Sequence, residues 1–557
     1  MKHRGSEIIC RLLERQGVEV VAGIPGGSNL PLYDALHDSA LRHILARHEQ
    51  GAGFIAQGMA RVTGRPGVCL ATSGPGATNL LTAIADAKLD SVPLVAITGQ
   101  VPLPMIGTDA FQEVDTYGLT LPITKHNFLV RSAGELLEVI PLAFTLAASG
   151  RPGPVVVDVP KDVQMASVEV GDWPEPGRAA VPAPCDGAVL DEMAERIRRA
   201  ERPVIYLGGG VAQAGAGGLA RDLAHRMQAP VVCTLMGLGA VPCDDPLCLG
   251  MLGMHGARHT NLLMDEADLL VVVGARFDDR ATGRAAEFCR HADILHIDID
   301  ASEIDKIKKS RVSLAGDAGL ALEGLLARVA PAARPAWAAR LAELRAADPA
   351  PAAGNDPLLP QNLIRLIGEA STPDTVVATD VGQHQMWTAQ GYPFRRPRRL
   401  LTSGGLGTMG FGLPAAIGAA LARPDLPVVC VSGDGSILMN LQELATLAEL
   451  DLNVKVVVMN NAHLGLVRQQ QELFYNRRYF ASSFQARPDF AAIARGFGLR
   501  GVDLGACADP AAAFAEALAA PGPCVINAPV HETENVLPMV PPGAANREMI
   551  GGLSHAN

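Results

Sequence analysis

Short apolar runs that end at polar or glycine-rich turns recur along this chain, with helix-like apolar spacing between them. The clearest example is residues 428–461, where the β-branched run Val428–Ser432 predicts a strand. Within residues 441–448 the apolar positions fall at i, i+3, i+4 and i+7, the spacing of a helix with one apolar face. A second apolar run, Val454–Met459, predicts another strand. This strand–helix–strand order is typical of a βαβ unit in a parallel sheet.

The same alternation fills three domain-sized segments. Proline- and alanine-rich stretches at residues 173–184 and 331–360 are expected to be linkers, the second with a helical piece inside it. We therefore predict an α/β protein with three doubly wound parallel-sheet domains, at residues 1–165, 185–330 and 360–545. The other expected elements are a helix at Leu80–Lys88 and strands at Val18–Ile24, Val68–Thr72, Pro93–Thr98, Pro203–Leu207, Val231–Leu235, Leu269–Val273, Ile294–Ile299 and Thr375–Thr379.

Composition narrows the possible functions. The 557 residues are 48% hydrophobic and 19% charged, and no apolar run approaches the roughly 18 residues that a membrane helix needs. Glu7 and Arg11 interrupt the N-terminal segment, so we expect no signal peptide. The net charge of −11 is spread along the chain, without a basic block suited to nucleic acid. The ten cysteines lack zinc-like spacing, and we expect buried thiols in a cytoplasmic protein that binds neither membrane nor nucleic acid.

Polar residues follow both strands of the 428–461 unit at their carboxyl ends, where α/β sheets bind ligands. Asp434 and Asn461 could converge there as oxygen ligands for Mg²⁺, and Gly435 and Ser436 could offer backbone N–H groups to a phosphate. The simpler alternative is a tight turn closed by Asp434. A Gly-Asp-Gly turn followed by a double Asn one βαβ unit later is the pattern of thiamine-diphosphate enzymes, which favours the cofactor hypothesis.

Four further residues are candidates for the chemistry of such a cofactor. Glu49 begins a predicted helix, where a carboxylate is ordinarily favoured by the helix dipole. A thiamine cofactor, however, needs one carboxyl group hydrogen-bonded to N1′ of its aminopyrimidine ring. Met409 lies in a glycine-rich loop and is either core filler or the apolar support beneath a bent cofactor. Gln383 and His384 follow another strand and could either bind a diphosphate or cap the next helix.

The middle segment carries weaker signals for a second nucleotide. Gly208 and Gly209 follow one predicted strand, Gly274 follows another, and Asp298 ends a third. Glycines and acids at strand ends suit a dinucleotide, but the segment has no GxGxxG pattern. Arg276, two residues after Gly274, could equally form an ion pair at a domain interface.

Across essentially the whole chain, these motifs resemble one family, the catalytic large subunit of acetolactate synthase, and most closely its bacterial isozyme I form. The matching segments are RHEQGAGFIAQGMAR, SGPGATN, GTDAFQE, RPGPVVVDVPKDV, GMLGMHG, GARFDDR, HIDID, DVGQHQMW, GGLGTMGFGLPAAIGAA, GDGS and the double Asn. The resemblance implies a pyrimidine domain, a central FAD domain and a diphosphate domain. It further implies decarboxylation of pyruvate on thiamine diphosphate. The hydroxyethyl unit is then joined to pyruvate, giving 2-acetolactate, or to 2-ketobutyrate, giving 2-aceto-2-hydroxybutyrate.

The resemblance assigns roles residue by residue. The residues expected in catalysis are Glu49, Gln112 and Met409, and those expected to contact the 2-keto acid substrates are Phe111, Lys161, Arg276 and Gln470. The expected thiamine-diphosphate contacts are Glu49, Val381, Gly382, Gln383, His384, Met409, Gly435, Ser436 and His463. The expected magnesium ligands are Asp434, Asn461 and the main-chain carbonyl of His463. The expected contacts of an FAD without a redox role are Arg151, Gly208, Gly209, Thr234, His255, Gly274, Arg276, Asp298 and Asp317.

One position, Gln470, departs from the family pattern. Most members have Trp where this chain has Gln470, and that Trp packs against the extra methylene of 2-ketobutyrate. We therefore expect near-equal use of pyruvate and 2-ketobutyrate as acceptors. The family also implies at least a homodimer, with a small regulatory subunit.

Two alternatives remain, a flavin-dependent pyruvate oxidase and an inactive cofactor-binding partner subunit. Glyoxylate carboligase is closer in sequence type, but that family lacks the glutamate matched here by Glu49, which argues against it.

Overall fold

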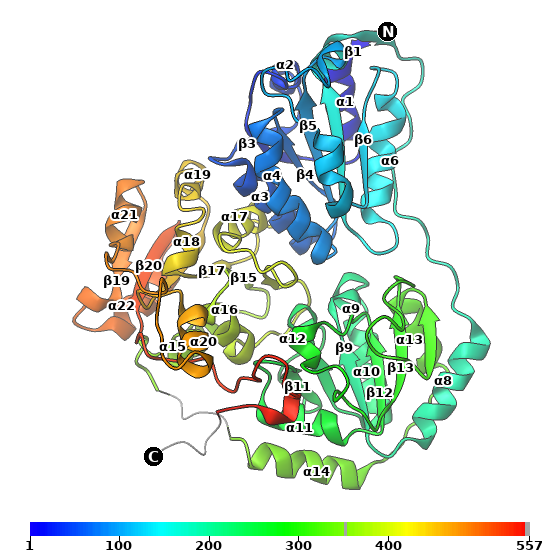
Figure 1. Ribbon diagram of the computed structural model, residues 1–557, viewed down its shortest axis with the longest axis vertical. Coiled ribbons are helices and arrows are strands. Elements are labelled where there is room, and N and C mark those ends of the chain that lie inside the picture. The colour runs from blue at the N-terminus through cyan, green and yellow to red at the C-terminus, as the bar shows by residue number, and fades with distance from the viewer. Residues whose placement is uncertain (350–353, 552–557) are drawn as a thin grey trace.

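Three six-stranded parallel sheets, each flanked by helices, make up the structure (Figure 1). The computed structural model describes residues 1–349 and 354–551. Every strand pair inside the three sheets is parallel, which confirms the predicted α/β class and the doubly wound architecture.

The first sheet is formed by the N-terminal part of the chain. Its strands, in order across the sheet, are β3 (Arg42–Leu45), β2 (Val20–Gly23), β4 (Gly67–Ala71), β5 (Leu94–Gln100), β7 (Pro154–Pro160) and β6 (His126–Leu129). Its helices are α1 (Gly5–Arg15), α2 (Leu30–His37), α3 (Glu49–Thr63), α4 (Pro75–Leu89), α5 (Thr116–Thr120), α6 (Leu136–Ala148) and α7 (Lys161–Met165). A short antiparallel pair joins β1 (Lys2–Arg4) to β8 (Ser167–Glu169). Strands β4, β5 and β7 are buried at every residue, as expected for parallel strands covered on both faces.

The third sheet repeats the strand order of the first. It runs β16 (Leu400–Leu401), β15 (Val376–Thr379), β17 (Val428–Gly433), β18 (Val454–Asn460), β20 (Cys524–Pro529) and β19 (Arg500–Asp503). Its helices are α15 (Pro360–Ala370), α16 (Gln383–Gly391), α17 (Gly412–Ala422), α18 (Asp434–Ile437), α19 (Glu443–Leu450), α20 (Gly465–Phe474), α21 (Phe490–Gly496) and α22 (Pro510–Ala519). When the strands of each sheet are numbered in chain order from β2 and from β15, both sheets read 2-1-3-4-6-5. The direction of strand addition therefore reverses between β2 and β4 in the first sheet, and between β15 and β17 in the third.

The middle sheet has a different order. It runs β11 (Cys248–Met251), β10 (Val231–Cys233), β9 (Pro203–Leu207), β12 (Leu269–Val273), β13 (Asp293–Asp298) and β14 (Val312–Ala315). Its helices are α8 (Gly187–Arg199), α9 (Gly209–Gln213), α10 (Gly217–Met227), α11 (Arg258–Glu266), α12 (Asp279–Thr282), α13 (Ala318–Leu326) and α14 (Pro335–Ala346). Numbered in chain order these strands read 3-2-1-4-5-6, the order of dinucleotide-binding folds.

Short 3₁₀ helices connect several of these elements. They are η1 (Leu103–Met105), η2 (Leu121–Ile123), η3 (Leu235–Gly237), η4 (Leu504–Ala506) and η5 (Asn546–Glu548). None of the helices that the structure describes is long and apolar enough to cross a membrane.

The expected linkers contain less regular structure than the domains. Residues 173–184 form neither helix nor strand, and α14 is the helical piece expected in the second stretch, of which residues 350–353 lie outside the described residues. One helix prediction was wrong at its start. Helix α4 begins at Pro75 rather than near Leu80, because proline at the first helical position costs no backbone hydrogen bond.

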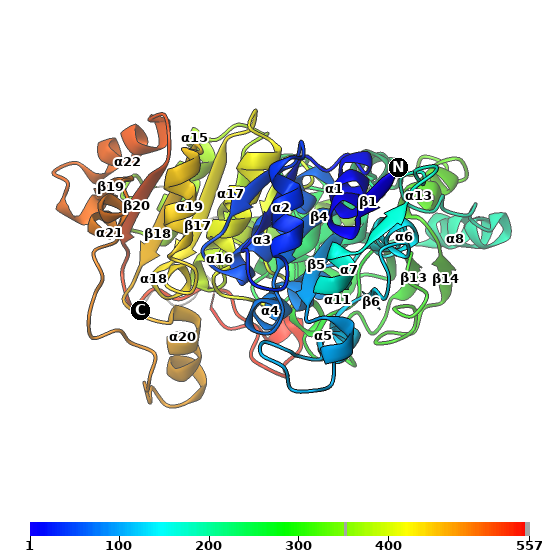
Figure 2. The ribbon, with the colours of Figure 1, turned by 90° about the horizontal axis from the view of Figure 1, so that it is seen from above.

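The first and third domains share a hydrophobic core. Helices α3 and α17 cross so closely that a Cβ on Gly58 would lie 2.1 Å from the carbonyl oxygen of Ala415. The rings of Phe54 and Phe411 pack edge to face there, 5.2 Å apart. Both views show these helices side by side, and in Figure 2 the elements α20 and α5 project from the lower side of the molecule.

Candidate active site

Two loops meet where the strand order of the third sheet reverses, between β15 and β17, the place where α/β sheets bind ligands. The hydroxyl group of Ser436 donates a 2.7 Å hydrogen bond to the carbonyl of Val381, so the two loops are joined. Gly435 lies beside Ser436 in the buried turn that Asp434 begins. Gly382 has a φ of 156°, a conformation that a side chain would strain, where the chain enters α16.

Gln383 and His384 begin α16, and both are buried. Gln383 Nε2 donates to Gln469 Oε1 at 3.0 Å and to the carbonyl of Glu534 at 2.9 Å, so α20 and the C-terminal segment hold it. Burial lowers the pKa of His384 to about 3, which keeps its imidazole neutral. Its Nε2 has no hydrogen-bond partner among the described residues, as expected where a ligand will supply one. Gln470 is exposed, next to the fully buried Gln469.

Asp434, Asn461 and His463 lie at the neighbouring ends of β17 and β18. The N–H of His463 donates to Asn461 Oδ1 at 3.1 Å, and Asn461 Nδ2 donates to Gln383 Oε1 at 3.0 Å. Burial raises the pKa of Asp434 to about 6, so ionised Asp434 needs a compensating positive charge.

Oxygen donors of these kinds fit Mg²⁺, which keeps several waters in its coordination shell. Within residues 1–349 and 354–551, no group of three His, Cys, Asp or Glu side chains could hold a metal ion. The expected ligands are not of that kind, because only one of them is such a side chain.

Glu49 is the first residue of α3 and is 9% exposed. Its Oε2 accepts a 2.9 Å hydrogen bond from Nδ2 of Asn79, which belongs to α4. A Cβ on Gly76 would lie 3.4 Å from Glu49 Oε1. The carboxyl group therefore lies against the first turns of α4, at the carboxyl end of β4.

The expected substrate loop packs on the same turn. A Cβ on Gly74 would lie 2.7 Å from the carbonyl oxygen of Gln112, whose own φ is +59°. The side chain of Phe111 is 87% exposed, which suits a residue that meets another molecule. Lys161 is the first residue of α7, directly after β7. These first-domain candidates thus gather along the carboxyl edge of the first sheet.

Met409 is half-buried in the glycine-rich loop between β16 and α17. The N–H of the next residue, Gly410, donates to Oδ1 of the fully buried Asp380 at 2.6 Å. The carbonyl of Gly410 accepts a 2.8 Å hydrogen bond from Asn440, which also donates to Gln50 of α3. The backbone on the C-terminal side of Met409 is therefore fixed within the third domain.

The middle sheet reverses its order between β9 and β12, and glycines occupy both strand ends. A Cβ on Gly208 would lie 2.0 Å from the carbonyl oxygen of Gly274, and one on Gly209 would lie 3.1 Å from Met236 Cβ. Glycine is thus required here because neighbouring backbone segments come too close for a side chain. A glycine turn at the switch point of a 3-2-1-4-5-6 sheet also fits a dinucleotide such as FAD.

Arg151 connects the first domain to the acids at the end of β13. Its Nη1 lies 3.1 Å from Asp300 Oδ2 and 2.7 Å from Glu303 Oε1. Asp298, the last residue of β13, is buried and accepts a 2.9 Å hydrogen bond from the N–H of Asp300. An expected FAD contact is therefore an interdomain ion pair in this structure.

The remaining middle-domain candidates lie at other strand and helix ends. Thr234 follows β10 and is buried, and Asp317 caps α13 through the N–H of Leu320. Burial lowers the pKa of His255 to about 4, so its ring is neutral. Arg276 is half-buried, and its guanidinium makes no hydrogen bond or ion pair with another described residue.

Hydrogen bonds join only some of these candidates to one another. The Glu49 carboxyl group bonds to Asn79, whereas its neighbours His48 and Gln50 bond to Glu443 and Asn440, in the segment after β17. Sequence reasoning did not assign roles to Asn79, Asp380 or Asn440. The first two lie inside the motifs SGPGATN and DVGQHQMW, which could have identified them, whereas nothing around Asn440 distinguishes it.

Models of three thiamine pyrophosphate enzyme domains match the chain in sequence order. They are the N-terminal TPP binding domain at residues 3–119, the central domain at residues 190–325 and the C-terminal TPP binding domain at residues 380–528. The fold and these matches define a thiamine-diphosphate-dependent enzyme.

Comparison with known proteins identifies the family within this class of enzymes. The chain is 56% identical to the acetolactate synthase isozyme 1 large subunit of Escherichia coli (strain K12), over 98% of this chain and 97% of that protein. It is 47% identical to the isozyme 2 large subunit of the same organism, over 99% and 100%. It is 48% identical to the acetolactate synthase large subunit of Parasynechococcus marenigrum (strain WH8102), over 99% and 91%. The chain belongs to the acetolactate synthase large-subunit family, which confirms the resemblance noted from its motifs.

Proposed function

We propose that this chain is the catalytic subunit that decarboxylates pyruvate and joins the two-carbon unit to a second 2-keto acid, in the first common step of branched-chain amino acid biosynthesis. The observation that carries the proposal is the joined pair of loops after β15 and β17. There Ser436 bonds to Val381, and His384 keeps a buried ring nitrogen without a partner. This arrangement can accept a diphosphate at the switch point of a sheet.

When bound, thiamine diphosphate supplies the electron sink for both halves of the reaction. Val381, Gly382, Gln383, His384, Gly435 and Ser436 would hold its diphosphate. Asp434, Asn461 and the His463 carbonyl would hold Mg²⁺, whose positive charge offsets the burial of Asp434. Glu49 would hold a proton at N1′ of the pyrimidine ring, while Met409 would support the bend between the two rings.

The substrates would meet residues from different domains. Phe111, Gln112 and Lys161 would line the first-domain side, and Arg276 would bind the carboxylate of the acceptor. Charge favours this role, because Arg276 is half-buried and its guanidinium makes no ion pair with a described residue. The family resemblance implies at least a homodimer, whose sites would combine residues of two subunits. A large subunit further implies a small regulatory subunit.

FAD would lie at the switch point of the middle sheet, near Gly208, Gly209, Thr234, Gly274 and Asp298. Its other expected contacts are Arg151, His255, Arg276 and Asp317. The proposed reaction has no net oxidation or reduction, so FAD would act as a structural group.

The proposal is tested with purified protein, thiamine diphosphate, Mg²⁺, FAD and pyruvate, by measuring acetolactate. We expect acetolactate formation without oxygen uptake, and Glu49→Gln should lower kcat about 10²- to 10⁴-fold, the usual contribution of a proton-transfer group. The control is Glu449→Gln, which removes an exposed ion pair with Arg47 and should leave activity unchanged. Oxygen uptake without acetolactate would indicate an oxidase instead. Full activity of Glu49→Gln would remove Glu49 from the mechanism.

A further inference from the structure

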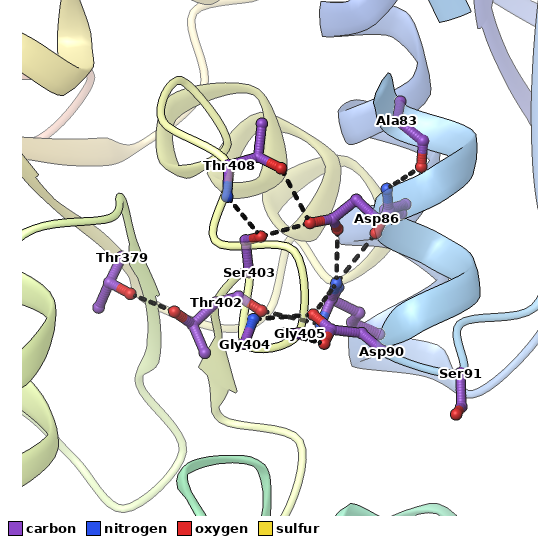
Figure 3. Close-up of polar contacts among 12 residues, drawn as sticks. Ala83, Asp86, Asp90, Ser91, Thr379, Thr402, Ser403, Gly404, Gly405 and Thr408 are labelled. Carbon is purple, nitrogen blue, oxygen red and sulfur yellow. Dashed lines mark hydrogen bonds and ion pairs between the residues drawn. The ribbon is translucent and has the colours of Figure 1, made fainter. Parts of the chain in front are cut away.

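A buried cluster of three charged side chains lies between the first and third domains (Figure 3). Arg61 of α3 places its Nη2 3.0 Å from Oδ2 of Asp86, on α4, and 2.9 Å from Oδ2 of Asp90, which caps the end of that helix. The side chains are 7%, 0% and 0% exposed, respectively. None of these residues belongs to the site described above.

The acids also bind the glycine-rich loop of the third domain. Asp90 accepts hydrogen bonds from the N–H of Gly405 at 2.7 Å and of Gly404 at 3.0 Å. Asp86 Oδ1 accepts hydrogen bonds from the hydroxyl groups of Ser403 and Thr408, the latter at 3.3 Å.

Arg61 also contacts the loop and the residue that follows it. Its Nη1 donates a 3.0 Å hydrogen bond to the carbonyl of Thr402, and its guanidinium lies 4.8 Å from the ring centroid of Phe411. The cluster therefore contacts the loop where it begins and on both sides of Met409.

Met409 lies between this cluster and a second anchor. On its N-terminal side, Thr408 bonds to Asp86 and donates its N–H to Ser403 Oγ at 2.8 Å. On its C-terminal side, Gly410 bonds to Asp380 of the third domain. The loop contains several glycines, whose backbone is otherwise mobile, so these contacts determine where Met409 lies.

The charges of the cluster do not balance as they would in a single ion pair. Two carboxylates face one guanidinium, and burial, together with the charge of Asp90, raises the pKa of Asp86 to about 6. A buried excess of acid is costly unless its oxygens accept hydrogen bonds, and the loop supplies the donors. The carboxylate that exceeds the charge of Arg61 is therefore stabilised by hydrogen bonds from the loop, and it holds the loop in turn.

We infer that Asp86 and Asp90, held by Arg61, are positioning residues that set Met409 against thiamine diphosphate from a separate domain. The inference rests on the proposed function and deepens it. In this arrangement, the packing of the first domain on the third determines the geometry of a cofactor contact that both domains must share.

The test is a double-mutant cycle between Asp90→Asn and Met409→Ala in the full enzyme, loaded with thiamine diphosphate and Mg²⁺. We expect Asp90→Asn to lower kcat about 10²-fold, as a 1 Å misplacement can do, with a smaller change in the KM for pyruvate. Calorimetric titration with thiamine diphosphate and Mg²⁺, without substrate, should show weaker cofactor binding in Asp90→Asn, as in Met409→Ala. If Asp90 acts through Met409, the double variant should be no slower than Met409→Ala alone. Independent, multiplicative losses, or an unchanged kcat in Asp90→Asn, would overturn the inference.

A second variant covers the case in which Asp90→Asn does not fold. Ser403→Ala keeps all three charges but removes the hydroxyl that joins Asp86 to the N–H of Thr408. It should show the same lowered kcat and the same lack of additivity with Met409→Ala, and full activity would overturn the inference. Glu449→Gln, which alters another interdomain ion pair, should combine multiplicatively with Met409→Ala. A wild-type enzyme that forms no acetolactate would instead overturn the proposed function.

Discussion

At the scale of single residues, the exposed side chain of Gln470 on α20 is expected to set acceptor preference. The preceding residue fixes the helix, because Gln469 is fully buried and bonds to Gln383 and to the backbone of Val536. Gln470 is therefore presented outward from an anchored helix. Its amide offers little apolar surface to the extra methylene of 2-ketobutyrate.

Replacing Gln470 with Trp should raise the preference for 2-ketobutyrate over pyruvate. One methylene in an apolar pocket is worth about 1–3 kcal/mol, so the ratio of products should rise about 10-fold or more from a near-equal wild-type value. Competition assays with both acceptors measure this ratio. Gln470→Asn, which adds no apolar surface, is the control and should behave as wild type. A strong 2-ketobutyrate preference in the wild type would contradict the expectation.

The sequence predicted those residues that form local motifs. Asp434, Gly435 and Ser436 lie in one turn, and their position after a β-branched run was enough to place them at a strand end. The cluster around Arg61 could not be found in this way, because Arg61 and Thr402 are 341 positions apart. An arginine in a helix is ordinarily expected in solvent, and only the packing of two domains buries it.

At the scale of elements, the crossing of α3 and α17 connects parts of the proposed site that the sequence places far apart. Glu49 begins α3, and the Met409 loop leads into α17. Small residues let the two backbones touch, since a Cβ on Gly418 would lie 2.0 Å from the carbonyl oxygen of Ile55. The sequence predicted a helix beginning at Glu49, but it predicted neither α17 nor the packing of the two helices, in which nearly every residue of both is buried.

Gly418→Ala should therefore destabilise the protein although it favours the helix. Alanine gains up to about 1 kcal/mol in helix propensity, but the added methyl group must push two backbones apart, at a cost of about 1–3 kcal/mol. We expect a lower melting temperature and a reduced kcat, because the start of α3 moves with the crossing.

Gly218→Ala on α10 is the matched control for this change. An added Cβ there has no neighbour within 4 Å, so this variant should lose no stability. A Gly418→Ala protein as stable and active as wild type would show that the crossing tolerates expansion.

At the scale of the whole molecule, two sheets of identical order flank a third of the dinucleotide-binding order. The alternation of strands and helices in the sequence predicted three parallel sheets. It could not predict that the first and third share the order 2-1-3-4-6-5, because strand order depends on contacts between distant segments. The shared order gives both domains an equivalent switch point, where α/β sheets bind ligands. We expect one to hold Glu49 and its neighbours and the other to hold the proposed diphosphate contacts, so a complete site would need both.

Cofactor binding should therefore stabilise the entire chain, and Mg²⁺ should be necessary for it. Ionised Asp434 is unfavourable in its buried position without a cation, so thiamine diphosphate alone should bind weakly. At a cofactor concentration 100 times its dissociation constant, binding adds about 2.7 kcal/mol to the free energy of unfolding, which should raise the melting temperature by several degrees.

EDTA should remove this increment in melting temperature, and Asp434→Asn should lack it even with Mg²⁺ present. Glu449→Gln should keep it, since neither member of that ion pair is expected to hold the cofactor or Mg²⁺. An increment that survived both EDTA and Asp434→Asn would show that the diphosphate is held without a metal at this turn.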